Sequence, residues 1–220
     1  MLRRFPMRLL VLLGGFVLLP APVQPDVAGT CALHAPSRVA IGRPHIGLQV
    51  TMSGPCHSSG YASWDLYHPS QGLQKIAIFD NATTAHWDVY SYDTIGVHTW
   101  RPSIAWDAAF VDQAQNEPTS TVKLAVGAWI SSSRSGDVVT LNGTSLLYSV
   151  SNNTYFKRSA AGVFQFRERG TTQWNNLKSV WTTSSGEVTM AYRYSATRDY
   201  RFALYSTPIS WDIVSAVTTR

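Results

Sequence analysis

Residues 45–52 read HIGLQVTM, and their alternation sets the fold class of the chain. Ile46, Leu48, Val50 and Met52 fall on one side of an extended backbone, while polar or small residues occupy the positions between them. A hydrophobic period of two residues is that of a β-strand with one buried face, whereas an amphipathic helix repeats every 3.6 residues. The stretch therefore predicts a half-buried strand.

The same period recurs near the other end of the chain. Val188, Met190, Tyr192 and Tyr194 share one face of a predicted strand, and no stretch shows a convincing helical period. Turn sequences rich in Gly, Pro, Asn and Ser interrupt the strands at short intervals. Many short strands with such spacing are typical of an antiparallel β-sandwich. We expect an all-β protein built of immunoglobulin-like or fibronectin-III-like sandwiches.

The length and one polar stretch predict two domains. The chain has 220 residues, 45% of them hydrophobic, and a single seven-strand sandwich needs about 100 residues. Residues 112–120 (DQAQNEPTS) are polar, contain Pro118 and separate two strand-rich halves. We expect a linker here, with a first sandwich over residues 30–117 and a second over residues 118–220.

The N-terminus predicts export. Three arginines in the first eight residues precede an apolar run over residues 9–19, which ends at Pro20. This is the pattern of a signal peptide, because a membrane-spanning helix needs about 20 apolar residues. We expect residues 1–29 to be a leader, cleaved between about residues 21 and 30, and the product to be secreted without a stable membrane anchor.

Charge and cysteine content bear on partners and compartment. The formal net charge of +5 includes the three leader arginines, and without them the excess is too small to predict a nucleic-acid partner. Cys31 and Cys56 are the only cysteines, so export to an oxidising space predicts a disulfide between them. The alternative, a lipid-modified Cys31, would leave Cys56 unpaired.

The last part of the chain contains a pattern known from Greek-key sandwiches. Tyr200 precedes Phe202 by two residues on a predicted strand, with Phe202 expected to face inward. This resembles the tyrosine corner, in which the tyrosine hydroxyl donates to the backbone near the strand end. We expect a structural role for Tyr200.

Five segments resemble known proteins. Residues 134–143 (RSGDVVTLNG), 163–188 (VFQFRERGTTQWNNLKSVWTTSSGEV) and 197–202 (TRDYRF) resemble bacterial immunoglobulin-like domains of secreted proteins from high-GC Gram-positive bacteria. Residues 61–72 (YASWDLYHPSQG) and 93–102 (DTIGVHTWRP) resemble the companion domain that often precedes them. The resemblance implies fold and compartment in a family of unknown function, and it implies neither a catalytic residue nor a ligand.

Histidines and acidic residues in the first half are the raw material for an enzyme or a metal site. Their spacing matches no zinc or calcium motif, and no G-x-S-x-G sequence is present. We therefore expect no enzyme, no cofactor and no metal site, with a metal-dependent or hydrolytic enzyme as the alternative. The residues it would draw on are His34, His45, His57, His68, His86, His98, Asp65, Asp80, Asp88, Asp93 and Asp107.

Aromatic residues make up 12% of the chain and supply candidate ligand contacts. Strand alternation predicts that Trp64 and Trp87 point into the core together with Leu66 and Val89. A one-residue error in this alternation would exchange the inward and outward sets. The residues expected to point outward, with Trp174 added from the second half, are Tyr67, Tyr90, Tyr92, His98, Trp100 and Trp174; all but His98 are candidate ligand contacts.

These features favour a secreted, non-enzymatic binding or adhesion module. Its expected ligand is a cell-wall or environmental polysaccharide, or a protein. A secreted inhibitor is a further alternative, which would present Arg134 or Arg158 on a flexible turn.

Overall fold

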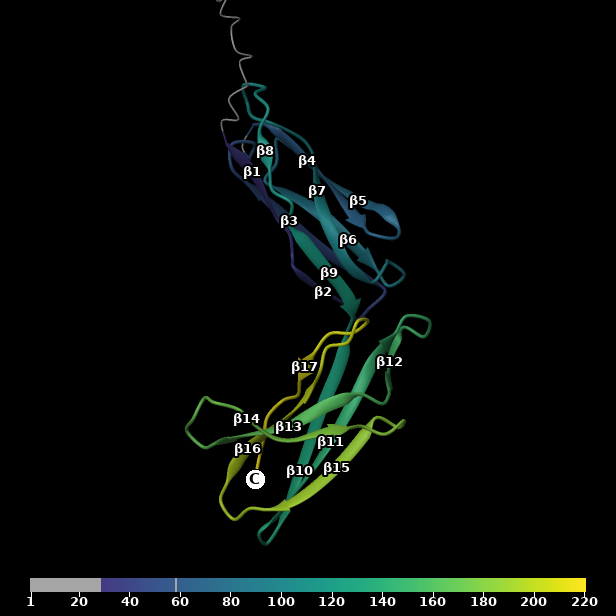
Figure 1. Cartoon of the computed structure of the whole chain (residues 1–220), viewed down its shortest axis with the longest axis vertical. Coiled ribbons are helices and arrows are strands. Elements are labelled where there is room, and N and C mark those ends of the chain that lie inside the picture. The colour runs from purple at the N-terminus through teal and green to yellow at the C-terminus, as the bar shows by residue number, and fades with distance from the viewer. Residues whose placement is uncertain (1–28, 58) are drawn as a thin grey trace, which may run out of the picture.

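The computed structural model describes residues 29–57 and 59–220, and residues 1–28 of the predicted leader lie outside this part of the chain. The described residues form strands and turns without a helix, so nothing among them resembles a membrane-spanning helix. They fold into two immunoglobulin-like sandwiches in tandem (Figure 1), which confirms the predicted fold class.

The first sandwich packs a sheet of order β6-β3-β1-β8 against a sheet of order β2-β9-β7-β4-β5. Two pairs, β1 with β8 and β2 with β9, are parallel, and the other pairs are antiparallel. The strands are β1 (Thr30–His34), β2 (Arg38–Ile41), β3 (His45–Ser53), β4 (Tyr61–His68), β5 (Gly72–Asp80), β6 (Thr84–Tyr90), β7 (Gly96–Trp106), β8 (Ala114–Gln115) and β9 (Thr119–Leu124).

The second sandwich also has two sheets. In one, β11 pairs with β10 on one side and with β12 and β15 on the other, and the second has the order β14-β13-β16, with β17 and β18 both on β16. The strands are β10 (Val126–Ser135), β11 (Val138–Ser149), β12 (Thr154–Lys157), β13 (Ala161–Glu168), β14 (Asn175–Trp181), β15 (Glu187–Arg193), β16 (Arg198–Leu204), β17 (Ile213–Val214) and β18 (Thr218–Thr219).

The two-residue alternation in the sequence matches the burial of the strands. In β3 the side chains from Ile46 to Met52 that were predicted to share a face are buried or half-buried, and the positions between them are exposed. β15 shows the same alternation. Trp64 of β4 is fully buried and meets Phe79 edge to face. A buried tryptophan on this strand is a hallmark of immunoglobulin-like sandwiches.

The division between the domains lies later than the sequence predicted. β9 pairs with β7 and with β2, so residues 119–124 belong to the first sandwich, and the chain enters the second only at Ala125. The expected linker is also part of the first sandwich. Asn116 donates to the backbone of Leu33 and accepts from it, at 3.0 and 2.8 Å. The stretch is polar because its side chains bond to backbone, so the boundary predicted after residue 117 was placed too early.

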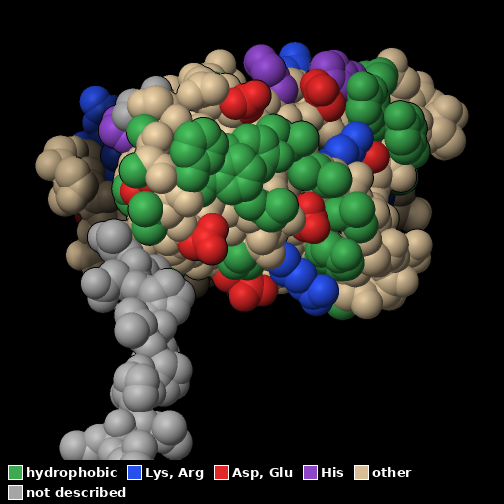
Figure 2. Space-filling view, turned by 90° about the horizontal axis from the view of Figure 1, so that it is seen from above, with side chains coloured by type: hydrophobic (Ala, Val, Ile, Leu, Met, Phe, Trp, Pro, Cys, Tyr) green, Lys and Arg blue, Asp and Glu red, His purple; other side chains and the backbone are tan. Residues whose placement is uncertain are grey.

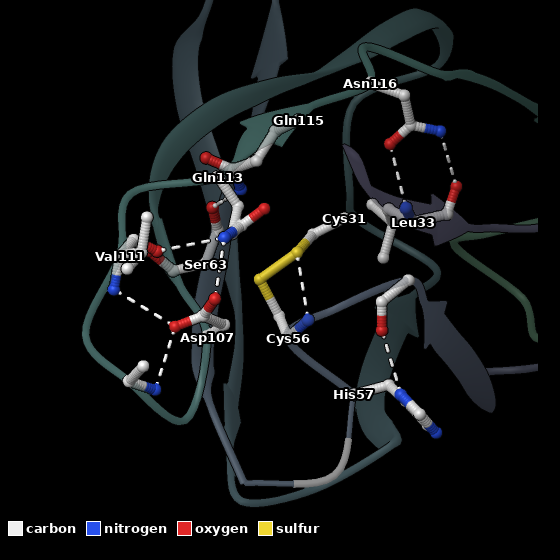
Figure 3. The surroundings of a disulfide bond; sticks show 12 residues. Cys31, Leu33, Cys56, His57, Ser63, Asp107, Val111, Gln113, Gln115 and Asn116 are labelled. Carbon is white, nitrogen blue, oxygen red and sulfur yellow. Dashed lines mark hydrogen bonds between the residues drawn. A yellow bond between two sulfur atoms is a disulfide. The ribbon is translucent and has the colours of Figure 1, made fainter. Parts of the chain in front are cut away.

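The predicted disulfide is confirmed. Cys31 of β1 is bonded to Cys56 in the turn that follows β3, and both cysteines are fully buried. Figure 3 shows the bond beside the loop that contains Asp107 and Gln113. A disulfide of this kind fits a protein that matures in an oxidising compartment.

The two sandwiches follow each other end to end along the long axis (Figure 1), and side chains of both meet at the junction. Only Ala125 separates β9 from β10, and the buried core of the first sandwich continues into Leu147 and Tyr148 of β11. Trp211, in the segment before β17, donates from its indole nitrogen to the carbonyl of Val39 at 2.6 Å. Arg38 lies over the same indole ring at 4.1 Å and pairs with Asp212 at 2.9 Å. These contacts link the domains beyond the chain connection.

Candidate functional site

The structure places Trp100 and His98 inside the first sandwich, against prediction. Trp100 is 1% exposed and donates to the hydroxyl of Ser120 at 3.0 Å. His98 is 3% exposed, while its apolar neighbour Val97 faces solvent. In β7 a polar residue, His98, points inward and an apolar one, Val97, points outward. The predicted inward and outward sets of this strand are therefore exchanged, as a one-residue error in alternation would do. Trp100 is therefore closed to a ligand.

His98 sits at a narrow crevice between the two sheets. Its pKa is lowered mainly by burial, and the nearby His68 lowers it further, whereas the Gly96 carbonyl and Asp93 raise it. The crevice has about 20 Å³ of space, which holds about one water molecule. Across residues 29–57 and 59–220, no group of three His, Cys, Asp or Glu side chains is placed to hold a metal ion.

Tyr67 faces outward, but its ring is covered. The guanidinium carbon of Arg101 lies 4.4 Å from the centre of the Tyr67 ring. This contact is a cation–π interaction, which holds the arginine on the ring face that a sugar would need.

Two of the predicted ligand contacts, Tyr90 and Tyr92, lie side by side. Their rings are stacked 5.2 Å apart with an interplanar angle of 6°, and His45 lies on the Tyr90 ring at 4.9 Å. The Nε2 atom of His45 bonds to Asp88 at 2.7 Å. Tyr92 is 76% exposed. We call His45, Tyr90 and Tyr92 the tyrosine platform.

The sheet of order β2-β9-β7-β4-β5 has an apolar surface on its outer face that the sequence pattern did not predict. Register places Ser63 of β4 between Ile78 of β5 and Ile104 of β7, so the two isoleucines flank it on adjacent strands. Next along the sheet, Tyr61 and Trp106 stack with ring centres 4.6 Å apart. The isoleucines are about half exposed. We call Tyr61, Ile76, Ile78, Ile104 and Trp106 the apolar face.

Phe110 projects from the loop that follows the apolar face. Its side chain is 81% exposed, and its backbone is left-handed, with φ of 60°. Asp107 holds this loop: its Oδ1 atom accepts from the amides of Ala109 and Val111 at 2.8 and 3.0 Å. Its Oδ2 atom accepts from the side chain of Gln113 at 2.9 Å (Figure 3). Figure 2 views the molecule from the end at the top of Figure 1 and shows a central group of hydrophobic side chains, with further hydrophobic side chains beside it.

A backbone φ near +60° is favourable for glycine or asparagine and strained for a residue with a bulky side chain. Phe110 keeps this conformation because the Asp107 carboxylate satisfies the loop amides. Such strain clusters at sites that contact ligands. Residues 107–112 (DAAFVD) contain no glycine, proline or asparagine, and the one local signal is Asp107, whose carboxylate can accept from the backbone two residues further on.

Trp174, predicted as a ligand contact in the second sandwich, is half-buried. The guanidinium carbons of Arg201 and Arg167 lie 4.2 and 4.9 Å from the centre of its ring. Two other tryptophans are more exposed than Trp174: Trp129 at 63% and Trp181 at 72%. The alternation of β10 could have identified Trp129.

Tyr200 is fully buried, as expected of a structural residue, but its hydroxyl does not bond to the backbone. It bonds to the hydroxyl of Tyr192 at 2.6 Å. Burial and this contact raise the pKa of Tyr200. The tyrosine-corner hydrogen bond predicted from the sequence is therefore wrong in its partner, because the Tyr192 hydroxyl on β15 lies within hydrogen-bond distance of the Tyr200 hydroxyl. Phe202 points inward as expected.

Arg134, a residue that an inhibitor loop would present, is tied down. It donates to the carbonyls of Tyr194 and Ala196 at 2.5 and 2.7 Å. Its guanidinium therefore fastens β10 to the segment after β15.

Comparison with known proteins does not assign the chain to a family. No protein-family model matches the chain, and no curated protein matches it. Among solved structures, the chain is similar to the D0-D1 domain of Intimin, at 11% identity and a TM-score of 0.27, covering 86% of this chain and 96% of that one. It is also similar to the D00-D0 domain of Intimin, at 12% identity and a TM-score of 0.28, covering 86% and 98%. The immunoglobulin-like assignment rests on the strand pairing described above.

Proposed function

We propose that this protein is an exported, non-enzymatic binding module that attaches to a protein partner through Phe110 and the apolar face. The observation that carries the proposal is the exposed Phe110 side chain on a strained loop held by Asp107. Export is supported by the buried disulfide and by the signal-peptide pattern of the leader. Origin in a high-GC Gram-positive bacterium stays a prediction from the sequence.

The energetics of Phe110 favour a partner. A left-handed backbone at a bulky residue costs on the order of 1–3 kcal/mol, and an exposed ring returns nothing to the fold. Burying a phenylalanine side chain against another protein stabilises a complex by about 1.5–3 kcal/mol. Aromatic side chains supply much of the binding energy at protein interfaces. Because Asp107 already orders the loop, binding through the Phe110 ring costs little further conformational entropy.

The apolar face gives the contact its area. Ile76 and Ile78 of β5 and Ile104 of β7 are each about half exposed on the two strands that flank β4, beside the stacked pair Tyr61 and Trp106. Contiguous exposed apolar surface on a soluble protein marks an interaction site. A flat sheet face of this kind suits a protein surface better than a small molecule, which binds in a concave pocket.

A binding assay with matched variants tests the proposal. Labelled protein spanning residues 29–220 is added to cells of the producing organism and to the same cells after protease treatment. We expect Phe110→Ser to reduce binding about tenfold, as expected of a central aromatic contact, and protease treatment to abolish binding. Trp181→Ser, which removes a ring that is 72% exposed on the second sandwich, should bind like the wild type. Wild-type binding by Phe110→Ser would contradict the proposal.

The tyrosine platform favours a second candidate, polysaccharide binding. The outer face of Tyr92 is open, and stacking on an aromatic ring is one way in which proteins bind sugars. The test is retention on insoluble polysaccharides and bacterial cell walls, with and without a chelator. Loss of retention in Tyr92→Ala, with retention kept in Trp181→Ala and in chelator, would support it. Retention lost with chelator would favour a metal-dependent site instead.

A further inference from the structure

The outer face of the sheet that contains β13 and β16 carries an excess of positive charge. Arg167 and Arg169 both bond to the single carboxylate of Asp199, at 3.0 and 3.2 Å. Thr219 donates to the same carboxylate at 2.7 Å, and the Asp199 side chain is 7% exposed. One buried carboxylate is thus shared by two arginines, and its two oxygens are occupied.

Arg201 adds a third guanidinium to this face. Its Nε atom donates to the side-chain carbonyl of Gln165 at 2.7 Å, and the Gln165 amide donates to Asn176 at 2.8 Å. No acidic side chain within residues 29–57 and 59–220 forms an ion pair with Arg201. The side-chain acceptors around Arg201 are therefore engaged, whereas its two terminal nitrogens have no protein acceptor in that part of the chain.

Trp174 holds two of these arginines close together. The Arg201 and Arg167 guanidinium carbons lie 4.2 and 4.9 Å from its ring centre, so both rest against the same indole. Burial lowers the pKa of Arg201, and the charge of Arg167 lowers it further. A guanidinium group in a protein is always charged at neutral pH. An anion between them would relieve their mutual repulsion.

We propose that Arg167 and Arg201, positioned by Trp174, bind the oxyanion groups of an acidic polysaccharide. The planar guanidinium suits carboxylates and sulfates because it donates two parallel hydrogen bonds. Asn176, on the same face, uses its carbonyl to accept from Gln165, so its amide nitrogen can donate to a sugar hydroxyl. Arg169, whose side chain is 62% exposed, extends the basic surface for a further anionic group along the chain.

This inference goes beyond the proposed function. It concerns the second sandwich and a glycan, whereas the proposed protein contact lies on the first sandwich. We call Arg167, Arg169, Trp174 and Arg201 the Arg201 surface. Phe110 takes no part in it, so either proposal can fail without the other.

The test is binding to immobilised polygalacturonate, which carries carboxylates, to heparin, which also carries sulfates, and to neutral dextran. We expect the wild type to bind one or both acidic polymers and not dextran, with weaker binding as salt is raised. Arg201→Gln should bind about tenfold more weakly, the usual scale for a lost hydrogen bond to a charged group. Binding to polygalacturonate assigns carboxylates as ligands, and binding to heparin alone assigns sulfates.

The control is Arg193→Gln, which removes the same charge at a side chain that is 80% exposed and lies on β15. It should change the affinity less than twofold. An equal loss in both variants would show a general charge effect and overturn the proposal, as would equal binding to dextran or no binding to either acidic polymer. If Arg201→Gln does not fold, Arg201→Lys keeps the charge without the forked geometry, and its expected loss is about threefold.

Discussion

The buried carboxylate of Asp199 accepts hydrogen bonds from three side chains. The hydrogen bond from Thr219 is the largest cause that holds its pKa below the ordinary value of 3.8, and Arg167 and Arg169 add to it against the opposing effect of burial. Because the folded state prefers the charged form, this stabilisation is present above the unfolded pKa. It is lost as the pH falls below about 3.8 and through the lower folded value.

We therefore predict that Asp199→Asn lowers the melting temperature at pH 7 and that the difference from the wild type shrinks toward pH 2.5. Thermal unfolding followed by circular dichroism at both pH values measures this. Asp137→Asn serves as control, because Asp137 is half exposed and meets Arg193 at 3.5 Å. Exposed pairs contribute little, so its melting temperature should match the wild type at pH 7. A pH-independent effect of Asp199→Asn would contradict the assignment.

Trp100 gives a prediction that depends on its burial. The indole ring meets Trp87 edge to face at 5.3 Å and donates to Ser120. Trp100→Ala should lower the free energy of unfolding by about 3–5 kcal/mol, the range for a buried aromatic residue. Urea unfolding monitored by fluorescence measures it.

The comparison for Trp100 is Tyr92→Ala, which removes an exposed ring from the same sandwich. Its effect should stay within about 0.5 kcal/mol, as for most surface substitutions. Similar small effects of both substitutions would mean that Trp100 faces solvent.

At the residue scale, strand alternation predicts burial only where side-chain type and direction agree. Trp64 and Trp87 follow apolar neighbours at two-residue spacing and are buried as expected. His98 shares the inward face of β7 with Trp100, so a polar residue hides the apolar pattern. Phe110 lies outside any strand, and its exposure depends on hydrogen bonds made by Asp107, which composition does not reveal.

Among the elements, β1 depends most directly on a covalent bond. It has five residues, pairs with β3 over residues 32–34 and is bonded through Cys31 to the turn after β3. We predict that the double substitution Cys31→Ala and Cys56→Ala lowers the free energy of unfolding by about 3 kcal/mol, mostly by enlarging the unfolded ensemble.

Denaturant unfolding of this double variant, together with hydrogen exchange of the β1 amides, measures the effect. Reduced wild-type protein should reproduce the loss, because it lacks the same bond. Unchanged stability in both would show that pairing with β3 and β8 alone holds β1 in place.

The segment before β9 shows a limit of sequence reasoning at the element scale. A polar stretch with a proline predicts a linker when its side chains are assumed to face water. Here Asn116 bonds to Leu33, and its own carbonyl accepts from Trp64 at 2.9 Å. The sequence does not distinguish a side chain solvated by water from one that bonds to the backbone of another strand.

For the whole molecule, the junction around Trp211 predicts coupled unfolding. Trp211 bonds to Val39 and stacks with Arg38, so its removal weakens contacts between the sandwiches without disturbing either core. We predict that Trp211→Ala separates one calorimetric transition into two, as expected of domains that have lost their shared interface.

Trp181→Ala is the control for the junction, because it removes an exposed indole that lies on β14. It should keep the single transition. Two transitions in the wild type itself would show that the junction does not couple the domains.

The number of domains and their class could be predicted from the two-residue period and the chain length, but their junction could not. It is built from residues far apart in sequence, such as Arg38 and Asp212, which no local pattern relates. The candidate surfaces likewise differ in whether a local sequence pattern could predict them. The tyrosine platform includes two predicted residues, whereas the apolar face and the Arg201 surface depend on which strands are neighbours.

The disulfide also limits how far the molecule can be stretched. A protein that binds one partner through its first sandwich and another through its second carries mechanical tension along its chain when the two partners are pulled apart. Under such a load an unfolded domain lengthens by about 3.3–3.6 Å per residue. Cys31 and Cys56 are 25 positions apart in sequence, so their bond removes about 80 Å of that extension. Even after its sheets separate, the first sandwich would keep a closed, inextensible loop, and the two bound partners would stay closer together.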